Sequence, residues 1–402
     1  PTVYNYIHIG NARSAVAFDT IRRYFEYCGY TVNYISNFTD VDDKIIKAAN
    51  EAGISTKELS DKFIAAFMED TAQLGIKPAT QNPRVINYMD EIIAFVSTLV
   101  DKGFAYVSEG DVYFRVAKSN NYAKLANKTL EDLEIGASGR TDAETERKEN
   151  PLDFALWKAA KEGEVSWDSP WGPGRPGWHI ECSVMSTEIL GDTIDIHGGG
   201  ADLEFPHHTN EIAQSEAKTG KTFANYWMHN GFVNVDNEKM SKSLGNFVTV
   251  HDMLKTVDGQ VLRFFLATQQ YRKPINFTEK AIHDAEVNLK YLKNTHSLPL
   301  TDQVNQDELQ TYLEAFQEAM DDDFNTANGV TVLFDMAKWI NSGNYDQTVK
   351  DVFEKMLQVF GIVFEEEVLD EDIEKLIEER QAARANKDFA TADRIRDELA
   401  AQ

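Results

Sequence analysis

The chain has 402 residues, and its 66 acidic against 40 basic side chains give a formal net charge of −26. This charge excludes a histone-like protein that coats DNA, although a local basic surface can still bind a nucleic acid. A hydrophobic content of 42% supports ordinary globular domains. Two cysteines exclude a disulfide framework and favour the reducing cytoplasm. No apolar run reaches the length that a membrane span needs.

The first hundred residues alternate between strand-like and helix-like segments. Residues 3–7 form a short apolar run typical of a strand, and Gly10 ends it. Apolar spacing next predicts a helix at residues 12–28, a strand at 31–35, and helices at 55–74 and 84–102. A strand, a glycine turn, a helix and a second strand begin a doubly wound α/β domain.

The pattern changes near residue 104 and returns near residue 177. Alternation predicts a strand at residues 111–116, and a Trp-, Pro- and Gly-rich segment follows at 166–178. After it, predicted strands at residues 193–197 and 227–235 flank a predicted helix at 207–218. We therefore predict one Rossmann-like domain built from two halves, residues 1–103 and 177–235. A connective insertion, residues 104–176, lies between them.

The C-terminal part of the chain differs in both pattern and charge. Residues 280–402 have helical spacing and contain no proline after Pro299, which predicts a helical bundle. Residues 281–402 hold 27 acidic and 11 basic side chains and so carry −16 of the net charge. We place a connecting region at residues 236–285 and a helical domain at 286–402.

A cationic segment follows the second half of the α/β domain, at Lys239-Met240-Ser241-Lys242-Ser243. Two lysines three positions apart among small hydroxyl side chains suit a polyphosphate whose charge changes during a reaction. A lone pair of lysines at this spacing is more often a solvated loop. The complete pentapeptide is far rarer by chance.

A second polar segment, His8-Ile9-Gly10-Asn11, lies between the first predicted strand and the first predicted helix. Free amide groups and the helix dipole attract phosphate at such a position. Gly10 allows a nucleotide to approach the backbone, and His8 and Asn11 can donate hydrogen bonds to phosphate oxygens. Taken alone, this short motif would carry little weight.

Cys182, His207, His208 and Glu211 form a possible metal cluster. His207 and Glu211 are four residues apart, so both side chains project from one helical face. Cysteine, histidine and glutamate are ligands that zinc accepts, although zinc usually takes four ligands and this set supplies three. A buried cysteine near a surface His/Glu pair explains the same residues without a metal.

Together, the two phosphate motifs resemble the HIGH and KMSKS signatures of class I aminoacyl-tRNA synthetases, in the same order. The second signature matches fully, whereas Asn11 stands where the family has a histidine and cannot carry a charge. Further segments resemble the cysteinyl-tRNA synthetases, at residues 2–13, 37–44, 175–183, 195–203 and 205–211. The resemblance spans essentially the whole chain. It implies a class I α/β catalytic domain with an insertion, followed by a C-terminal α-helical bundle.

The resemblance also implies roles for individual residues. Phosphate binding and catalysis fall to His8, Asn11, Lys239 and Lys242, with Gly10 and Asp202 also contributing to the ATP site. The substrate cysteine is expected to lie against Thr39, Trp178 and His197. One Zn²⁺ per chain is expected on Cys182, His207 and Glu211, and the family's fourth ligand is a cysteine that falls two positions before Pro1. Cys28 does not match that ligand and is predicted to lie in the core.

The implied function is the activation of L-cysteine by ATP with Mg²⁺, followed by transfer to the 3′ end of tRNA(Cys) in a cytoplasmic monomer. The resemblance identifies residues 236–285 with the KMSKS loop and a stem-contact region, and 286–402 with a tRNA-binding domain. A small anticodon-binding module is expected to begin where the chain ends, at Gln402. Arg380, Arg384 and Lys387 form a local basic stripe that predicts salt-sensitive tRNA binding.

Two other functions fit parts of the sequence. A cysteine ligase of the mycothiol pathway makes the same adenylate and transfers it to an amino sugar, but the helical segment at residues 380–399 favours tRNA. A tRNA- or nucleotide-binding protein without activity is the other alternative. The intact lysine motif and the intact Cys182, His207 and Glu211 set argue against it.

Overall fold

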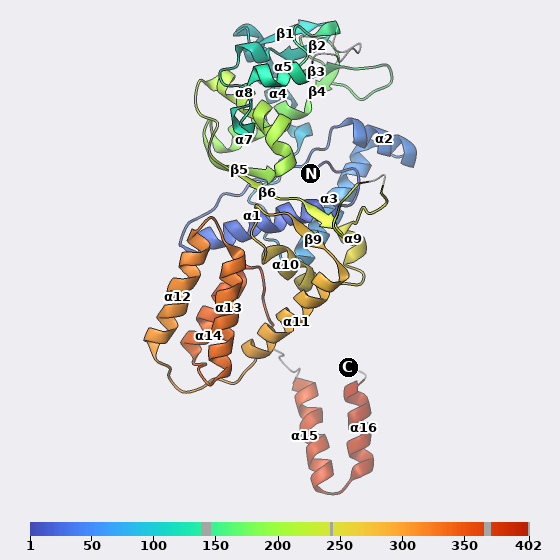
Figure 1. Cartoon of the computed structure of the whole chain (residues 1–402). Coiled ribbons are helices and arrows are strands. Elements are labelled where there is room, and N and C mark those ends of the chain that lie inside the picture. Colours follow the sequence, from blue (N-terminus) through green and yellow to red (C-terminus); the bar gives the residue numbers. More distant parts are fainter. Residues whose placement is uncertain (138–145, 242–243, 366–370, 401–402) are drawn as a thin grey trace. The chain divides into compact units, whose positions relative to one another are not determined.

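The computed structural model describes residues 1–137, 146–241, 244–365 and 371–400. The chain forms two compact units, Pro1–Ile362 and Val363–Gln402. The first unit holds mixed α/β structure followed by four long helices, and Figure 1 labels its elements from α1 to α14. No helix among the described residues is both long and apolar enough to cross a membrane.

The N-terminal half is organised around helix α1. It runs over Ile9–Tyr27, close to the prediction, and is followed by α2 (Asp43–Ala52), α3 (Thr56–Gln73) and α4 (Met89–Asp101). Ser55 accepts a hydrogen bond from the Glu58 amide at 3.1 Å, which caps the start of α3. Val3, Phe38, Ile45 and Phe63 are buried together where α2 and α3 meet the N-terminal segment.

The two strands predicted in this half, at residues 3–7 and 31–35, do not form as continuous strands. The N-terminal segment divides its backbone hydrogen bonds between two partners, because Val3 bonds to Thr39 whereas Ile7 and Ile9 bond to residues 248–250. Residues 31–35 make one isolated parallel bridge, Ile35 with Gln81. Each segment is therefore extended, but neither has the repeated pairing with one neighbour that defines a ladder.

The middle of the chain adds a small antiparallel sheet of order β1-β2-β3-β4, at Ala105–Ser108, Asp111–Phe114, Phe154–Ala159 and Gly174–Pro176. The sheet lies in the range assigned to the insertion, although the domain boundaries themselves stay predictions. Its buried face, with Val112 and Trp157, packs against Leu99 of α4 and Ile180 of α7 (Trp178–Leu190). Helix α5 (Leu130–Ala137) belongs to the same region. The sheet thus supports the start of α7, where Trp178 lies.

The second half of the α/β structure follows α7. Strands β5 (Ile194–Gly200) and β6 (Ala224–Asn230) pair in parallel and are connected through α8 (Thr209–Thr219). A second small sheet has the order β8-β7-β9, from Glu238–Lys239, Val233–Val235 and Ile275–Phe277. The short helices α9 (Val250–Met253) and α10 (Gly259–Ala267) return the chain to α1, which α10 contacts.

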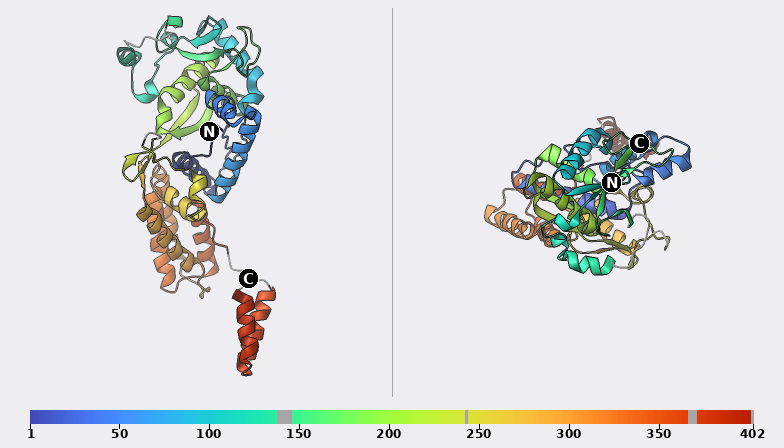
Figure 2. Two further views of the ribbon diagram at one scale, coloured as in Figure 1. Left: turned by 90° about the vertical axis from the view of Figure 1, so that its right-hand side faces the viewer. Right: turned by 90° about the horizontal axis from the view of Figure 1, so that it is seen from above.

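Four helices form the bundle predicted for the C-terminal part: α11 (Glu279–His296), α12 (Gln306–Asp321), α13 (Thr326–Asn341) and α14 (Gln347–Val359). Their contact surfaces bury Leu292, Phe316, Met336 and Phe353. The bundle and the β1–β4 sheet lie at opposite ends of the first unit, with α1 between them (Figure 2). Cys28, predicted to be buried, is exposed, because it is the C-cap of α1 and directly precedes Gly29, which has φ 95°.

The second unit is a helical hairpin of α15 (Glu371–Ala385) and α16 (Phe389–Ala400). Ala383, Ala392 and Ile395 are buried between the two helices. Asp388 accepts hydrogen bonds from the amide and the hydroxyl of Thr391, which fixes the start of α16. Arg384 and Lys387 of the predicted basic stripe are exposed, and Arg380 is half-buried.

Candidate active site

His8 and Asn11 cap the start of helix α1 by holding each other's backbone. The Asn11 amide donates to His8 Nδ1 at 3.2 Å, and the His8 amide donates to Asn11 Oδ1 at 3.2 Å. Because Nδ1 accepts a hydrogen bond, a neutral His8 ring carries its proton on Nε2. Burial lowers the pKa of His8, and nearby Asp202 acts in the opposite direction. His8 therefore offers a neutral N–H donor beside the helix N-terminus.

Gly10 has a reason to be glycine that the sequence did not reveal. A Cβ at this position would lie 2.9 Å from Cε1 and Nδ1 of the His8 ring and 3.8 Å from Cε of Met240. The ring of His8 also meets Phe247 edge-on, with 5.1 Å between centroids. The start of α1 is thus packed against both sides of the lysine motif, at Met240 and Phe247. Neither hydrophobic residue was expected in the site.

The segment around the lysine motif is joined to the segment before α1 by backbone hydrogen bonds. The Ile9 amide donates to the Val248 carbonyl and the Val250 amide to the Ile7 carbonyl, both at 3.0 Å. Asn246 braces the loop, since its Oδ1 accepts from the Ser241 amide at 2.9 Å. The two segments predicted to bind phosphate therefore lie side by side.

Lys239 ends the short strand β8, and its side chain is exposed. Its ammonium lies over the ring of Phe232, 5.2 Å from the centroid. The last two residues of the lysine motif, Lys242 and Ser243, lie outside the described residues. Their roles stay predictions.

The predicted metal residues Cys182, His207 and Glu211 come together from α7, the turn before α8, and α8 itself. One ligand atom from each lies within 4.8 Å of the other two. Oε1 of the fully buried Glu211 has no hydrogen-bond partner among the described residues. A sulfur, an imidazole nitrogen and a carboxylate oxygen at one point suit zinc, and an orphaned buried carboxylate oxygen is costly without such a partner. The residues present fit the metal.

Electrostatics around Cys182 also favour a cation. Burial raises the pKa of the Cys182 thiol well above its ordinary value, and the carboxylates of Glu211 and Glu181 raise it further. A bound divalent cation reverses this and stabilises the thiolate. The nitrogen of Pro1 lies near enough to Cys182 for an electrostatic interaction.

Two of the three residues predicted to hold cysteine, Trp178 and His197, contact this cluster. Trp178, 42% exposed, stacks on His207 with 4.0 Å between ring centroids and 17° between planes. Thr39 is buried, and its amide donates to the Pro1 carbonyl at 2.9 Å. His197 is engaged with the metal cluster, because its Nε2 lies 3.0 Å from Oε2 of Glu211. Such a contact orients a metal-binding carboxylate.

Two histidines to which the sequence analysis gave no role, His179 and His229, lie against the predicted metal-cluster residues His207 and His208. His179 lies 2.9 Å from His207, Nδ1 to Nδ1, and His208 Nδ1 lies 2.8 Å from His229 Nε2. His197, His208 and Glu211 form a second possible metal triad that shares Glu211 with the first. Five of the nine histidines fall between residues 179 and 229, a clustering that was visible in the sequence.

These histidines predict that the metal-free protein loses stability in acid. Burial lowers the pKa of His179 to about 3 and also lowers the pKa of His207, His208 and His229. In the unfolded chain the pKa is about 6.5, so as the pH falls below about 6.5 the unfolded state binds more protons than the folded state. Their stabilising contribution is therefore complete above about pH 6.5 and falls as the pH drops, by about 1.4 kcal/mol per histidine and pH unit.

Urea unfolding of chelator-treated protein at about pH 7.5 and 5.5 checks this prediction. Buried Glu181, whose pKa is raised by burial first and by Asp42 and Asp40 next, opposes the trend because it favours the folded state at lower pH. We expect a net loss on the order of 2 kcal/mol at the lower pH. Equal or greater stability at pH 5.5 would contradict the burial of neutral histidines.

The chain matches three protein families along its length. Residues 1–287 match the family described as tRNA synthetases class I (C) catalytic domain, and residues 315–365 match the DALR domain. Residues 366–402 match the cysteinyl-tRNA ligase anticodon binding domain. This last match begins well before Gln402, where the sequence reading expected that module to start.

Curated relatives align with this chain over its whole length. It is 94% identical to the cysteine–tRNA ligase of Streptococcus thermophilus and 82% identical to that of Streptococcus agalactiae serotype III. Each alignment covers 402 residues, which are 100% of this chain and 90% of the relative.

Solved structures support the fold. A Mycobacterium tuberculosis methionyl-tRNA synthetase in complex with methionyl-adenylate aligns with TM-score 0.63 and 15% identity, covering 89% of this chain and 87% of that one. A LeuRS ternary complex of Agrobacterium radiobacter aligns with TM-score 0.65 and 10% identity, covering 90% and 82%. The predicted class I α/β fold with a C-terminal helical part is confirmed, and the chain belongs to the cysteine–tRNA ligase family.

Proposed function

We propose that the chain joins cysteine to tRNA(Cys) in two steps at the site described above. In the first step the carboxylate of cysteine attacks the α-phosphate of ATP, and cysteinyl-adenylate forms as pyrophosphate leaves. The attacking group is already ionised, so alignment and charge stabilisation are sufficient and no general base is needed. In the second step a ribose hydroxyl at the tRNA 3′ end takes the cysteinyl group, and AMP leaves.

The residues of the two phosphate segments have different roles in the first step. His8 donates from Nε2 to a phosphate oxygen, while the α1 N-terminus supplies further amide donors. Lys239 and Lys242 stabilise the negative charge that builds on pyrophosphate. The backbone amide of Asn11 donates to Nδ1 of His8 and so keeps the histidine in the donor tautomer. The Asn11 side chain accepts from the His8 amide, which holds the start of the helix. We place Asp202 beside the nucleotide, and Mg²⁺ is expected to accompany ATP.

Cys182, His207 and Glu211 are proposed to hold one zinc ion, and the cysteine expected two positions before Pro1 is proposed as the fourth ligand. The nitrogen of Pro1 lies near enough to Cys182 for an electrostatic interaction, which supports that placement. When bound, zinc favours a thiolate over a hydroxyl because it is a soft Lewis acid that lowers the pKa of a thiol. Oε1 of Glu211, which has no hydrogen-bond partner among the described residues, would be free to hold the ion, while His197 contacts Oε2.

Trp178 and Thr39 complete the cysteine pocket. The indole, stacked on His207, gives the small substrate side chain a rigid wall. Thr39 is proposed to contact the α-amino group. Asp40 does not supply a free charge there, because both of its carboxylate oxygens are occupied, Oδ2 by Arg84 at 2.9 Å and Oδ1 by the Ile86 amide at 3.2 Å.

We propose a cytoplasmic monomer, and both cysteines are free thiols, as a reducing compartment would keep them. The observation that carries the proposed chemistry is the convergence of Cys182, His207 and Glu211 at one point, in a chain whose two phosphate segments are joined by backbone hydrogen bonds. The mycothiol-pathway ligase is not favoured, since the chain matches the anticodon binding domain at residues 366–402.

Pyrophosphate exchange tests the first step and acceptor competition tests the second. We expect cysteine-dependent exchange of labelled pyrophosphate into ATP, and charging of tRNA(Cys) but not of a glucosaminyl-inositol. Exchange without tRNA charging, together with ligation to the amino sugar, would overturn the proposed acceptor. A chain that binds ATP but shows no exchange would be the binding protein considered above.

A further inference from the structure

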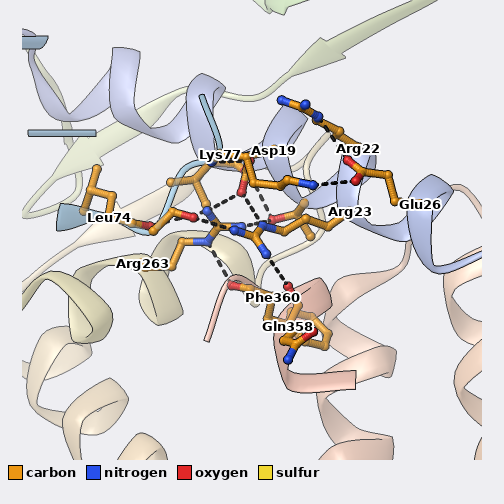
Figure 3. A network of polar contacts seen from close by, with 12 residues as sticks. Asp19, Arg22, Arg23, Glu26, Leu74, Lys77, Arg263, Gln358 and Phe360 are labelled. Carbon is orange, nitrogen blue, oxygen red and sulfur yellow. Dashed lines mark hydrogen bonds and ion pairs between the residues drawn. The ribbon is translucent and has the colours of Figure 1, made fainter. Parts of the chain in front are cut away.

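A buried charged network lies where helix α1 meets the end of the bundle (Figure 3). We call Asp19, Arg23 and Arg263 the junction residues. Arg263 is 0% exposed and Asp19 is 2% exposed, and Nη1 of Arg263 lies 2.6 Å from Oδ2 of Asp19. Nε of Arg23 donates to the same oxygen at 2.8 Å. One buried carboxylate therefore holds two guanidinium groups, from α1 and α10.

The two arginines donate hydrogen bonds to backbone carbonyls at the C-terminal ends of two other helices. Arg263 donates from Nε to the Phe360 carbonyl at 2.8 Å, and Arg23 donates from Nη1 to the Gln358 carbonyl at 3.0 Å, both at the C-terminal end of α14. Arg23 also donates from Nη2 to the Gly75 carbonyl at 2.8 Å, just after α3. The last carbonyls of a helix lack partners within it and attract cations.

The junction is closely packed. Gly361 has φ 74°, and a Cβ there would lie 2.3 Å from Cζ of Arg263. A Cβ at Gly75 would lie 2.9 Å from the Gly361 carbonyl oxygen. Burial lowers the pKa of Arg263, and Asp19 opposes this, which agrees with a charge that depends on its partner. The end of α14 is therefore fixed against α1 and α3 by specific polar contacts.

The position of this junction in the chain suggests its role. Helix α1 begins at the His8–Asn11 cap of the ATP site, whereas α14 ends at Val359, shortly before the anticodon binding match begins at residue 366. We infer that Asp19, Arg23 and Arg263 are positioning residues for tRNA charging, because they fix the departure point of the tRNA-binding segment relative to the catalytic helix.

This inference rests on the tRNA-charging function proposed above. A tRNA held at two places delivers its 3′ end to the adenylate at a high effective concentration, which depends on the rigidity of the connection. Misplacement by about 1 Å can cost about 10²-fold in rate. Adenylate formation uses only small substrates and needs no such connection. Loosening the junction therefore affects the second step selectively.

The test compares Arg23→Gln with Arg22→Gln in the full chain. Arg22 is the matched control, because it lies on the same helix and, in the part of the chain that the structure describes, its guanidinium donates to Glu26 and the Pro78 carbonyl rather than to α14. For Arg23→Gln we expect kcat/KM for tRNA charging to fall about tenfold, the effect of losing charge-assisted hydrogen bonds. The rate of pyrophosphate exchange should stay within about twofold of that of the unaltered chain. Tm should change by no more than a few degrees. Arg22→Gln should leave both reactions within about twofold.

Arg23→Lys provides a second reading if Arg23→Gln does not fold. Lysine keeps the charge beside Asp19 but cannot reach both carbonyls as a fork, so charging should fall less than in Arg23→Gln and exchange should be unchanged. Unaltered charging in the folded variant, a parallel fall of exchange and charging, or an equal defect in Arg22→Gln would overturn the inference. Failure of the proposed function itself would differ, since the unaltered chain would then charge no tRNA.

Discussion

Cys182→Ser is expected to lower kcat/KM for cysteine-dependent pyrophosphate exchange by about 100-fold or more. Loss of residues that merely orient a metal ligand already costs about 10–100-fold, and Cys182 is proposed as a ligand itself. Serine keeps the side-chain volume but replaces a soft sulfur with an oxygen that zinc holds less well at neutral pH. Bound zinc, measured by elemental analysis of the dialysed protein, should fall in parallel.

Cys28→Ser is the matched control, because Cys28 is the only other cysteine and lies exposed at the end of α1. It should keep both full zinc content and full exchange. The variant Cys182→Ser should also discriminate less between cysteine and serine, since a pocket without the metal is limited to about 10–200-fold for so small a difference. If Cys182→Ser retained zinc, exchange and discrimination, Cys182 would not be a ligand.

Lys239→Ala is expected to reduce kcat for adenylate formation by about 10²–10³-fold while KM for cysteine changes little. A positive group that meets charge developing on the leaving pyrophosphate acts mainly in the transition state, and loss of one such donor typically has this size. Lys239 is exposed, so its removal should leave the fold intact. Pre-steady-state measurement of adenylate formation separates this step from charging.

Lys255→Ala serves as the control, because Lys255 is also exposed and pairs only with Asp252 of α9 among the described salt bridges. It should react at the unaltered rate. Lys242 is expected from the sequence to matter at least as much as Lys239. A Lys239→Ala variant with normal kcat and raised KM for cysteine would assign the lysine to ground-state binding instead.

Local patterns in the sequence predicted the helices well. Helix α1 was expected at residues 12–28 and runs over Ile9–Tyr27, and the bundle follows where charge and spacing change. The predicted N-terminal strands failed for a reason that no local pattern contains. Their backbone partners, at Thr39, at residues 248–250 and at Gln81, are distant in the chain and do not extend one ladder.

For the candidate site too, the sequence predicted some features and not others. The sequence itself marked Cys182, His207, His208 and Glu211 as a possible metal cluster, and the family resemblance identified three of them as expected zinc ligands. The structure brings these three together. The sequence did not reveal that His197 contacts Glu211, that Trp178 stacks on His207, or that Asn11 caps His8. Arg263 and Asp19 lie 244 positions apart, and either residue alone reads as an ordinary surface charge.

X-ray absorption at the zinc edge tests the central claim most directly. The zinc-loaded full chain is measured alone, with cysteine and with serine. Direct selection of the substrate thiolate at the Cys182, His207 and Glu211 site predicts one additional zinc–sulfur distance of about 2.3 Å with cysteine and no added sulfur with serine. An unchanged zinc environment in cysteine-saturated protein that still forms adenylate would contradict the account.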